Sequence, residues 1–309
     1  MDYKLTQSSR IDSTPFTSRN DNAGVSSYTI YNKTLLPTIF KNYEKDYYHL
    51  INHVQIWDVC CQKVIEFKGP DALNFLRYVS CRNFEKIDEF KCYYTPMTNF
   101  EGGLLNDTLV YFIDKETIWI SISDSDMYMW FSGLLVNLNF NVTITNKKVY
   151  TVALQGPKAF RLTEELIDSK INALSFFSFD YFYFKNKKVL VSKTGYSKQG
   201  GYEFLFENSE IACNFWDFLV NEGKSFNIEV GCPNLIERVE NSLLSYGNDM
   251  TSKDTPYDCS LGKYCSIDMS YDFVGKNSLI KYIKNNEKKN IFHVFFGEND
   301  LKIKSKLKC

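Results

Sequence analysis

The hexapeptide Phe67-Lys68-Gly69-Pro70-Asp71-Ala72 indicates the architecture of this chain, because it joins a short apolar run to a helical pattern. Proline suits the first turn of a helix and aspartate suits its positive end, so the Gly-Pro-Asp tripeptide predicts a turn that begins a helix. The same arrangement returns in Leu154-Gln155-Gly156-Pro157-Lys158-Ala159. Two such strand–Gly-Pro–helix units predict an internal structural duplication.

Outward from these units, the apolar pattern alternates between helical and strand periods. Helices are predicted over residues 41–54, 72–79, 124–138, 210–222 and 233–246. Strands are predicted over residues 64–67, 91–97, 104–113, 117–122, 142–154, 181–192 and 202–206. This order predicts an α+β class with antiparallel or mixed sheets. No GxGxxG follows a strand, which disfavours a doubly wound dinucleotide fold.

The composition excludes several classes of protein. A length of 309 residues suggests about two domains. The hydrophobic share of 44% and the aromatic share of 16% exclude a disordered chain. The net charge is -1, which argues against a nucleic-acid binder. The N-terminus has no apolar segment typical of a secretory signal, and no stretch approaches the roughly 18 apolar residues of a membrane span. We therefore expect a cytoplasmic protein with no nucleic-acid or membrane partner.

Cysteine and histidine do not form a recognisable metal site. The nine cysteines include no CxxC pair, so a zinc ribbon or a disulfide framework is disfavoured and reduced thiols are expected. His49 and His53 stand four residues apart without an HExxH motif around them, so a helix-surface or core role is favoured over a metal site. Residues 1–28 are polar, and we expect an extended arm there.

The first candidate site is Glu101-Gly102-Gly103-Leu104-Leu105-Asn106-Asp107. The glycines permit a tight turn or a close backbone approach to a ligand. A carboxylate among leucines is costly without a partner, so Asp107 is a candidate acid, base or acceptor for a bound amine. The alternative is a hairpin with a solvated aspartate on its outer face.

The second candidate is the glycine-rich loop 195–201, followed by Tyr202-Glu203-Phe204. A glutamate between aromatic residues at the start of a strand can accept paired N–H donors from a heterocycle. An exposed glutamate in a hairpin is the alternative, and the residues alone favour it. The third candidate is Glu237-Arg238-Val239-Glu240 with Tyr246-Gly247-Asn248-Asp249, for which a charge network on a helix surface is the simpler interpretation.

Taken together and in order over residues 29–282, these motifs resemble the folate-dependent aminomethyltransferase family, which includes the T-protein of the glycine cleavage system. The matching segments are Trp57-Asp58-Val59, Gly69-Pro70-Asp71-Ala72, Gly102-Gly103-Leu104-Leu105-Asn106-Asp107, Leu154-Gln155-Gly156-Pro157, Thr194-Gly195-Tyr196, Gly201-Tyr202-Glu203, Arg238-Val239-Glu240, Tyr246-Gly247-Asn248-Asp249 and Asp272-Phe273-Val274-Gly275-Lys276.

Within the family, the chain is most similar to the branch of dimethylsulfoniopropionate (DMSP) demethylases. Glycine-cleavage members tend to have an acidic TGEDG loop and a paired DD, where this chain has Ser197-Lys198-Gln199-Gly200-Gly201 and Asn106-Asp107. Segments typical of the DMSP branch are Thr14-Pro15-Phe16-Thr17, residues 31–38, Ser123-Asp124-Ser125-Asp126, residues 195–201 and residues 233–240.

The resemblance implies a folate-binding fold of two interleaved subdomains around a central tetrahydrofolate (THF) site. Glu203 matches the glutamate that binds the pterin ring, and Asp107 matches the carboxylate near the reactive folate nitrogens. Asn234 stands where the family often has a folate-contacting arginine. Tyr196 matches a substrate-contacting position of the DMSP branch.

The implied reaction is methyl transfer from DMSP to THF, which gives methylmercaptopropionate and 5-methyl-THF without a metal or redox cofactor. Aromatic faces are expected to hold the sulfonium cation. Another methyl donor or an aminomethyl donor is an alternative, and the resemblance leaves a homodimer open.

The end of the chain supports a third interpretation. Family members continue past Lys276 into a β-barrel domain, whereas here a short helical linker leads into the last residues, 290–309. We expect residues 283–309 to be the truncated start of that domain. A non-catalytic folate-binding homologue would then be the alternative to an active enzyme.

Overall fold

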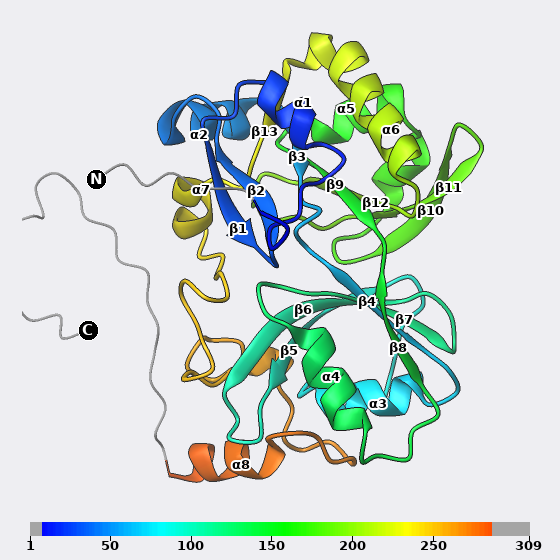
Figure 1. Cartoon of the computed structure of the whole chain (residues 1–309), viewed down its shortest axis with the longest axis vertical. Coiled ribbons are helices and arrows are strands. Elements are labelled where there is room, and N and C mark those ends of the chain that lie inside the picture. Colours follow the sequence, from blue (N-terminus) through cyan, green and yellow to red (C-terminus); the bar gives the residue numbers. More distant parts are fainter. Residues whose placement is uncertain (1–7, 286–309) are drawn as a thin grey trace, which may run out of the picture.

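The computed structural model describes residues 8–285 and contains two stacked β-sheets (Figure 1). The upper sheet has six strands in the order β10-β11-β12-β9-β3-β13. These are β10 (Phe179–Phe184), β11 (Lys187–Ser192), β12 (Gly201–Phe206), β9 (Tyr150–Gln155), β3 (Val54–Asp58) and β13 (Ile228–Gly231). The lower sheet has five strands in the order β5-β6-β7-β4-β8. These are β5 (Cys92–Thr98), β6 (Leu104–Phe112), β7 (Thr117–Ser121), β4 (Val64–Lys68) and β8 (Thr143–Lys147).

The two sheets are interleaved in the sequence. The chain leaves the upper sheet after β3, builds the lower sheet from β4 to β8, and returns to the upper sheet with β9. Within the two sheets only β13 and β3 pair in parallel; the other pairs are antiparallel. The predicted class, α+β with two interleaved subdomains of antiparallel or mixed sheet, is therefore confirmed.

The two Gly-Pro units adopt the same local structure, which confirms the predicted repeat at this level. Gly69 and Gly156 both have positive φ, at 141° and 124°, and a Cβ there would lie 2.5 Å and 2.3 Å from a backbone carbonyl oxygen. Two residues later, Asp71 N–H donates to Asn141 O at 3.2 Å and Lys158 N–H donates to His53 O at 3.2 Å. Only glycine permits this close approach, and a helix begins directly afterwards each time.

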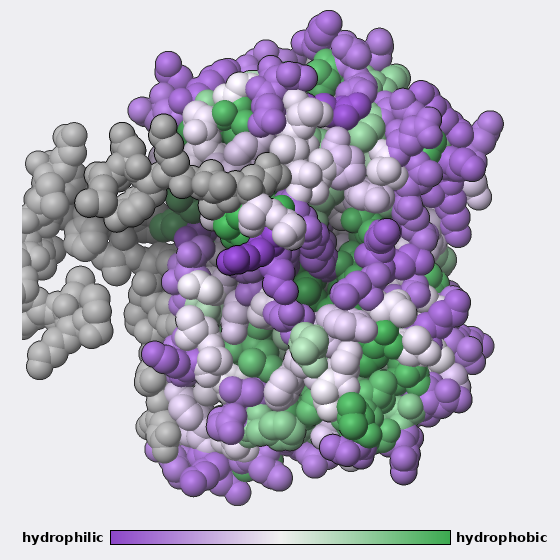
Figure 2. Space-filling model, viewed as in Figure 1, coloured by the Kyte–Doolittle hydropathy of each residue, from purple (hydrophilic) through white to green (hydrophobic). Residues whose placement is uncertain are grey.

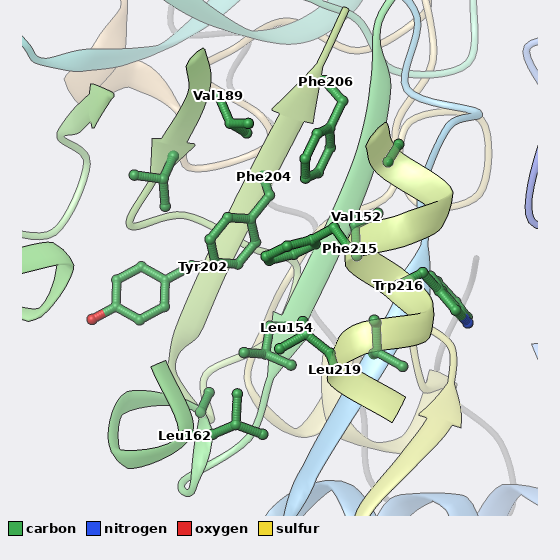
Figure 3. Packing of buried hydrophobic residues seen from close by; sticks show 14 of the residues in the cluster. Val152, Leu154, Leu162, Val189, Tyr202, Phe204, Phe206, Phe215, Trp216 and Leu219 are labelled. Atoms are coloured by element: carbon green, nitrogen blue, oxygen red, sulfur yellow. The ribbon is translucent and has the colours of Figure 1, made fainter. Parts of the chain in front are cut away.

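Helices cover the outer face of each sheet (Figure 1). The lower sheet packs on α3 (Ala72–Val79) and α4 (Met127–Leu135), and the upper sheet packs on α5 (Ala159–Leu166) and α6 (Ser209–Glu222). Figure 3 shows the core under α6, where side chains of β9 and β12 meet Phe215, Trp216 and Leu219. Alternate residues of a strand point to opposite faces, so the other side chains of these strands lie on the face away from the helices.

The two sheets meet in a buried apolar cluster, here called the inter-sheet layer. Its members come from β4, β5, β6 and β7 below and from β10, β11 and β12 above. They are Val64, Cys92, Tyr111, Trp119, Phe179, Leu190 and Leu205. Side chains on the same strand faces and close to these residues point toward the opposite sheet.

Two predicted strands are in fact pairs of strands. The run 142–154 divides into β8 and β9, which belong to different sheets. The run 181–192 belongs to the hairpin of β10 and β11, whose turn residues Lys185 and Asn186 both have positive φ, at 48° and 61°. Such a two-residue turn matches the twist of the paired strands, but its usual Asn-Gly signature is missing here.

The N-terminal segment differs from the extended arm that we predicted. It contains α1 (Thr17–Asn22) and the ribbon of β1 (Ser27–Tyr31) and β2 (Thr34–Ile39). Phe16 is fully buried and stacks on Trp216 with ring centroids 4.8 Å apart. Residues 8–28 are therefore anchored to the core under α6.

The remaining helices lie where the sequence predicts them, but their lengths differ from the prediction. The first, α2 (Tyr43–Asn52), lies within the predicted run 41–54. The predicted helix 233–246 is only α7 (Leu235–Glu240), because Ser242 adopts a left-handed φ of 56° and ends it. The last helix is α8 (Lys276–Lys284), and the expected start of a third domain at 283–309 lies almost entirely outside the described residues. None of the helices within 8–285 is long and apolar enough to cross a membrane.

Candidate functional site

Asp107 lies on β6, on the strand face that looks toward the upper sheet. It shares this face with Leu109 and Tyr111, and Tyr111 belongs to the inter-sheet layer. Its Oδ2 accepts a hydrogen bond from Tyr94 Oη at 2.9 Å. Its Oδ1 is buried and has no hydrogen-bond partner among residues 8–285. The solvated outer-face aspartate that was the alternative is therefore wrong.

Burial changes the acidity of this carboxyl. Desolvation raises the pKa of Asp107 to about 6, although the hydrogen bond from Tyr94 acts in the opposite direction. A buried carboxylate favours its neutral form unless donors or cations compensate. Asp107 therefore has an unused acceptor oxygen and a pKa close to neutrality, which suits hydrogen bonding to an amine or proton transfer.

Four phenols, here called the tyrosine cluster, lie within the electrostatic reach of Asp107. Burial raises the pKa of each phenol, and the charge of Asp107 raises it further. They come from β1, β5, the loop between β11 and β12, and the segment after α7. They are Tyr31, Tyr94, Tyr196 and Tyr246. Tyr94 thus contacts the carboxylate, and three further phenols from other elements lie near enough to feel its charge, a combination that favours an organic cation.

Glu203 is the equivalent acidic residue of the upper sheet. It lies on β12 with Leu205, a member of the inter-sheet layer, on the same strand face. It is only 6% exposed, which excludes the exposed hairpin glutamate. Its Oε2 accepts a short hydrogen bond from Thr194 Oγ1, and burial raises its pKa. The neighbouring Tyr202 and Phe204 pack in the core on the opposite face, so they do not line the site.

A chain of hydroxyl groups links the two sheets beside Glu203. Tyr111 Oη of the lower sheet lies 3.4 Å from Ser192 Oγ, which lies 2.6 Å from Thr194 Oγ1. Thr194 donates to Glu203 in turn. The charge of Glu203 also raises the pKa of Cys92 in β5, after the larger effect of burial. Asp107 and Glu203 therefore face the same space between the sheets, one from each side.

Tyr196 lies in the loop between β11 and β12. Its hydroxyl donates to the carbonyl oxygens of Leu243 at 3.2 Å and Leu244 at 3.0 Å. A segment that follows α7 therefore holds the ring, at a distance at which the charge of Asp107 raises the pKa of the phenol. The predicted contact of Tyr196 with substrate stays a prediction.

Asn234 is the N-cap of α7. Its Oδ1 accepts from the N–H groups of Ile236 at 2.9 Å and Glu237 at 3.2 Å, and its Nδ2 donates to Tyr43 O at 2.9 Å. Such caps stabilise a helix end by satisfying backbone donors. The side chain of Asn234 therefore stabilises the start of α7, and its contact with folate stays a prediction.

Glu237 and Arg238 correct the interpretation of the third motif as a charge network on a helix surface. Glu237 is fully buried and Arg238 is 8% exposed, whereas Leu235 and Ile236 are 45% and 41% exposed. Arg238 forms a close ion pair with Asp249. Two charged residues of this helix are therefore buried while two of its apolar residues are exposed, which is the reverse of the pattern that hydrophobic periodicity detects.

A surface groove of about 410 Å³ opens beside β6 and the start of α4. Its lining residues are Leu105, Ser125, Asp126, Met127, Met129, Trp130 and Tyr246. Leu105 lies two residues before Asp107, and Tyr246 belongs to the tyrosine cluster. In Figure 2, apolar side chains lie on the lower half of the molecule, in the region where Figure 1 shows α4.

The other candidate groups do not form a second site. The rings of His49 and His53 lie in a tilted contact with centroids 5.0 Å apart, and His49 Nε2 lies 3.0 Å from Asn227 O. No group of three metal-binding side chains occurs in the part of the chain that the structure describes. The eight cysteines within it are free thiols, as expected. Gly103 approaches a backbone rather than a ligand, since a Cβ there would lie 2.0 Å from Ser252 O.

The chain is similar to proteins of one family. A model described as the GCVT N-terminal domain matches residues 18–269. Dimethylsulfoniopropionate demethylase DmdA of Ruegeria pomeroyi is 38% identical over 290 residues, which cover 94% of this chain and 79% of that protein. An aminomethyltransferase of Thermotoga neapolitana is 28% identical over 263 residues, which cover 82% of this chain and 71% of that protein.

A solved structure supports the fold. Aminomethyltransferase T of the glycine cleavage system from Bartonella henselae superposes with a TM-score of 0.79 over 89% of this chain and 75% of that one. The sequence identity in that superposition is 18%. It shows that the two chains share their architecture.

Proposed function

Because the chain belongs to the GCVT N-terminal domain family, we propose that it transfers the sulfonium methyl group of DMSP to THF. The products are methylmercaptopropionate and 5-methyl-THF. Membership of the family makes the chain an enzyme of the THF-dependent methyl and aminomethyl transferases. The choice of DMSP rests on the 38% identity to a DMSP demethylase, against 28% to an aminomethyltransferase.

The proposal depends on two desolvated carboxyls. Each lies on one sheet and faces the other sheet. Glu203 and Asp107 both have a raised pKa because they are buried, and Asp107 Oδ1 has no partner within residues 8–285. A bound heterocycle with N–H groups would supply the missing donors. We propose that Glu203 binds the pterin ring and that Asp107 lies near the reactive folate nitrogen.

The sulfonium donor needs little chemical activation, because a neutral thioether leaves. The lone pair of folate N5 forms a bond to the methyl carbon while the C–S bond breaks and its electrons remain on sulfur. The nitrogen then loses its proton, and we propose that Asp107, with a pKa of about 6, accepts this proton or orients the amine. The enzyme's main contribution is to hold the two reactants in line and to exclude water.

The tyrosine cluster supplies the aromatic faces that a sulfonium cation requires. Tyr196 is the member that we propose to contact the donor. The cluster stands beside an acidic group, so the electrostatic field also favours a cation over a neutral amine donor.

The proposal is tested by product analysis. Purified protein is incubated with THF and DMSP, and methylmercaptopropionate and 5-methyl-THF are quantified; an aminomethyl donor is supplied in parallel. Formation of 5,10-methylene-THF instead would assign the chain to aminomethyl transfer. THF binding without either product would indicate a non-catalytic homologue and contradict the proposal.

The organisation of the molecule is part of the proposal. We place the folate-binding unit at residues 29–282 and add α1 and Phe16 to it, because they pack into its core. The family match, which begins at residue 18, supports this extension. A homodimer and a cytoplasmic location are proposed as well, and sedimentation of the purified protein tests the first.

A further inference from the structure

We propose that Glu237 is a positioning residue for the methyl donor, because it fixes the loop 194–200 that bears Tyr196. This inference rests on the proposed function for the identity of the donor. Glu237 does not itself need to touch either reactant. Its carboxylate acts through the loop.

The contacts of Glu237 Oε1 show how it holds the loop. The oxygen accepts from Lys198 N–H at 2.8 Å and from Gln199 Nε2 at 3.0 Å. A third bond comes from Asn241 Nδ2 on its own side, at 2.9 Å. The side chain is fully buried, and leaving one of these buried polar groups without its partner would cost free energy. Helix α7 is thereby tied to the loop through a single carboxylate oxygen.

The opposite side of the loop is held by Gln155 at the end of β9. Ser197 Oγ donates to Gln155 Oε1 at 2.7 Å, and Gln155 Nε2 donates to Thr194 O at 3.3 Å. A Cβ at Gly195, where φ is 149°, would lie 2.1 Å from Gln155 Nε2. The loop is therefore pressed against β9 on one side and bound to α7 on the other.

Tyr196 lies between these two attachments. Its hydroxyl donates to the carbonyls of Leu243 and Leu244, and Arg238 Nη1 donates to the same Leu243 carbonyl at 3.3 Å. The phenol, the loop and the end of α7 thus form one connected unit beside Asp107. Releasing the loop from Glu237 would let the ring leave the donor, while Glu203 stays in place because its backbone pairs with Ser192 of β11 and Ala153 of β9.

The loop also contains a trypsin cleavage site that can show whether the loop is fixed. Lys198 is exposed, and its backbone N–H is one of the two loop groups bound by Glu237. Trypsin needs several residues around its cleavage site in an extended, mobile conformation, so a fixed loop resists cleavage after Lys198. Loss of the attachment should expose that bond without unfolding the protein.

The experiment compares Glu237→Ala, Glu237→Gln and Gln199→Ala with the wild type. The Gln variant retains an acceptor oxygen, and the Gln199 variant removes one attachment from the loop side without altering α7. Glu240→Ala is the matched control, because Glu240 lies on the same helix but accepts from Tyr47 Oη instead. Cleavage after Lys198 is followed by mass spectrometry, together with the KM for DMSP and the Kd for THF.

We expect Glu237→Ala to accelerate cleavage about tenfold and to raise the KM for DMSP about tenfold, with the Kd for THF within about threefold of the wild type. Glu237→Gln should restore both values to within about threefold, and Gln199→Ala should fall between them. Should Glu237→Ala fail to fold, Gln199→Ala decides the question alone. Unchanged cleavage and KM in a folded variant would overturn the proposal. A wild-type protein that demethylates no DMSP would refute the proposed function, whereas unchanged cleavage after Lys198 would refute the attachment of the loop.

Discussion

At the scale of single residues, the site depends on carboxyl groups that the free protein stabilises only in part. A buried carboxylate without enough donors costs free energy, and a ligand that supplies those donors recovers it. Asp107 has one oxygen bonded to Tyr94 and one unused within residues 8–285. Glu203 has Thr194 as its donor and remains desolvated. Both side chains can therefore accept hydrogen bonds from the N–H groups of a ligand.

The pKa of Asp107 leads to a prediction about activity. Because burial raises this pKa to about 6, the carboxylate loses its charge as the pH falls through that value. We expect kcat/KM to decrease below pH 6, since this parameter reports ionisations of the free enzyme. Asp107→Asn should remove the inflection and lower methyl transfer by about 10²–10⁴-fold. Full methyl transfer with unchanged folate affinity in this variant would show that the proposed role is wrong.

The same substitution has a predictable effect on stability. The folded-state pKa of Asp107 lies above the unfolded value of about 3.9. Its contribution to stability is therefore fully present below pH 4 and is lost as the pH rises through 6. Asp107→Asn, which retains an oxygen for Tyr94, should be more stable than the wild type at pH 8 by about 1–3 kcal/mol. Urea unfolding at pH 4 and pH 8 tests this, and a pH-independent difference would contradict it.

Glu203 is expected to determine folate affinity. Glu203→Gln replaces one acceptor oxygen by a donor, so it would face the N–H groups of the pterin with an unsuitable partner. We expect the Kd for THF to rise about 10–100-fold, as for loss of a charged hydrogen bond. Thr163→Val is a control, because Thr163 is equally buried but lies on α5, away from the inter-sheet layer. Equal Kd values for Glu203→Gln and the wild type would remove Glu203 from the site.

Sequence identified these carboxyls but not their neighbours. The family resemblance selected Asp107 and Glu203, whereas the residues alone favoured an exposed hairpin glutamate for Glu203. Only Tyr196 of the tyrosine cluster was named from the sequence; the cluster as a whole could not be predicted, because the chain has 21 tyrosines and the four members come from four separate segments. Glu237 was assigned to a helix surface because its burial reverses the apolar pattern of α7. Residues that act through tertiary contacts leave little trace in local periodicity.

At the scale of elements, regular segments were predictable and irregular ones were not. The bounds of α3 agree residue for residue with the sequence prediction, since its Gly-Pro start and amphipathic face both fix it. The apolar pattern continued through the link between β8 and β9, so it could not show that these strands belong to different sheets. The end of α7 was missed because Ser242, rather than glycine, takes the left-handed conformation.

The cap of α7 gives a prediction that separates two roles of Asn234. If its task is to cap the helix, Asn234→Ala should reduce the free energy of unfolding by about 1 kcal/mol and leave folate affinity nearly unchanged. Asn208→Ala is the matched control, because Asn208 caps α6 by accepting from Ile211 N–H at 2.9 Å. Denaturant unfolding and THF titration are measured on both variants. A selective loss of THF affinity in Asn234→Ala would instead support the folate contact.

At the scale of the whole molecule, the interleaved topology explains why the site has contributions from both sheets. The strands of the lower sheet are inserted in the sequence between β3 and β9. Both ends of this insertion are therefore connected to the upper sheet. The inter-sheet layer fixes the separation between the sheets, and Asp107 and Glu203 stand on the strand faces that form it. Folate binding should therefore depend on packing that lies outside the binding site itself.

Leu190 and Leu219 test this dependence. Leu190 is 2% exposed in the inter-sheet layer, whereas Leu219 is fully buried in the core under α6, which belongs to one sheet alone. Either Leu→Ala change should cost about 2–5 kcal/mol, because each leaves a cavity. Only Leu190→Ala should let the two sheets shift, so we expect it to raise the Kd for THF about tenfold while Leu219→Ala leaves it within about threefold. The measurements are denaturant unfolding and THF titration at a temperature where both variants are folded. Equal folate affinity in two equally destabilised variants would contradict this expectation. The hydroxyl chain from Tyr111 to Glu203 and the backbone crossings would then hold the sheets together, and the apolar layer would contribute only to stability.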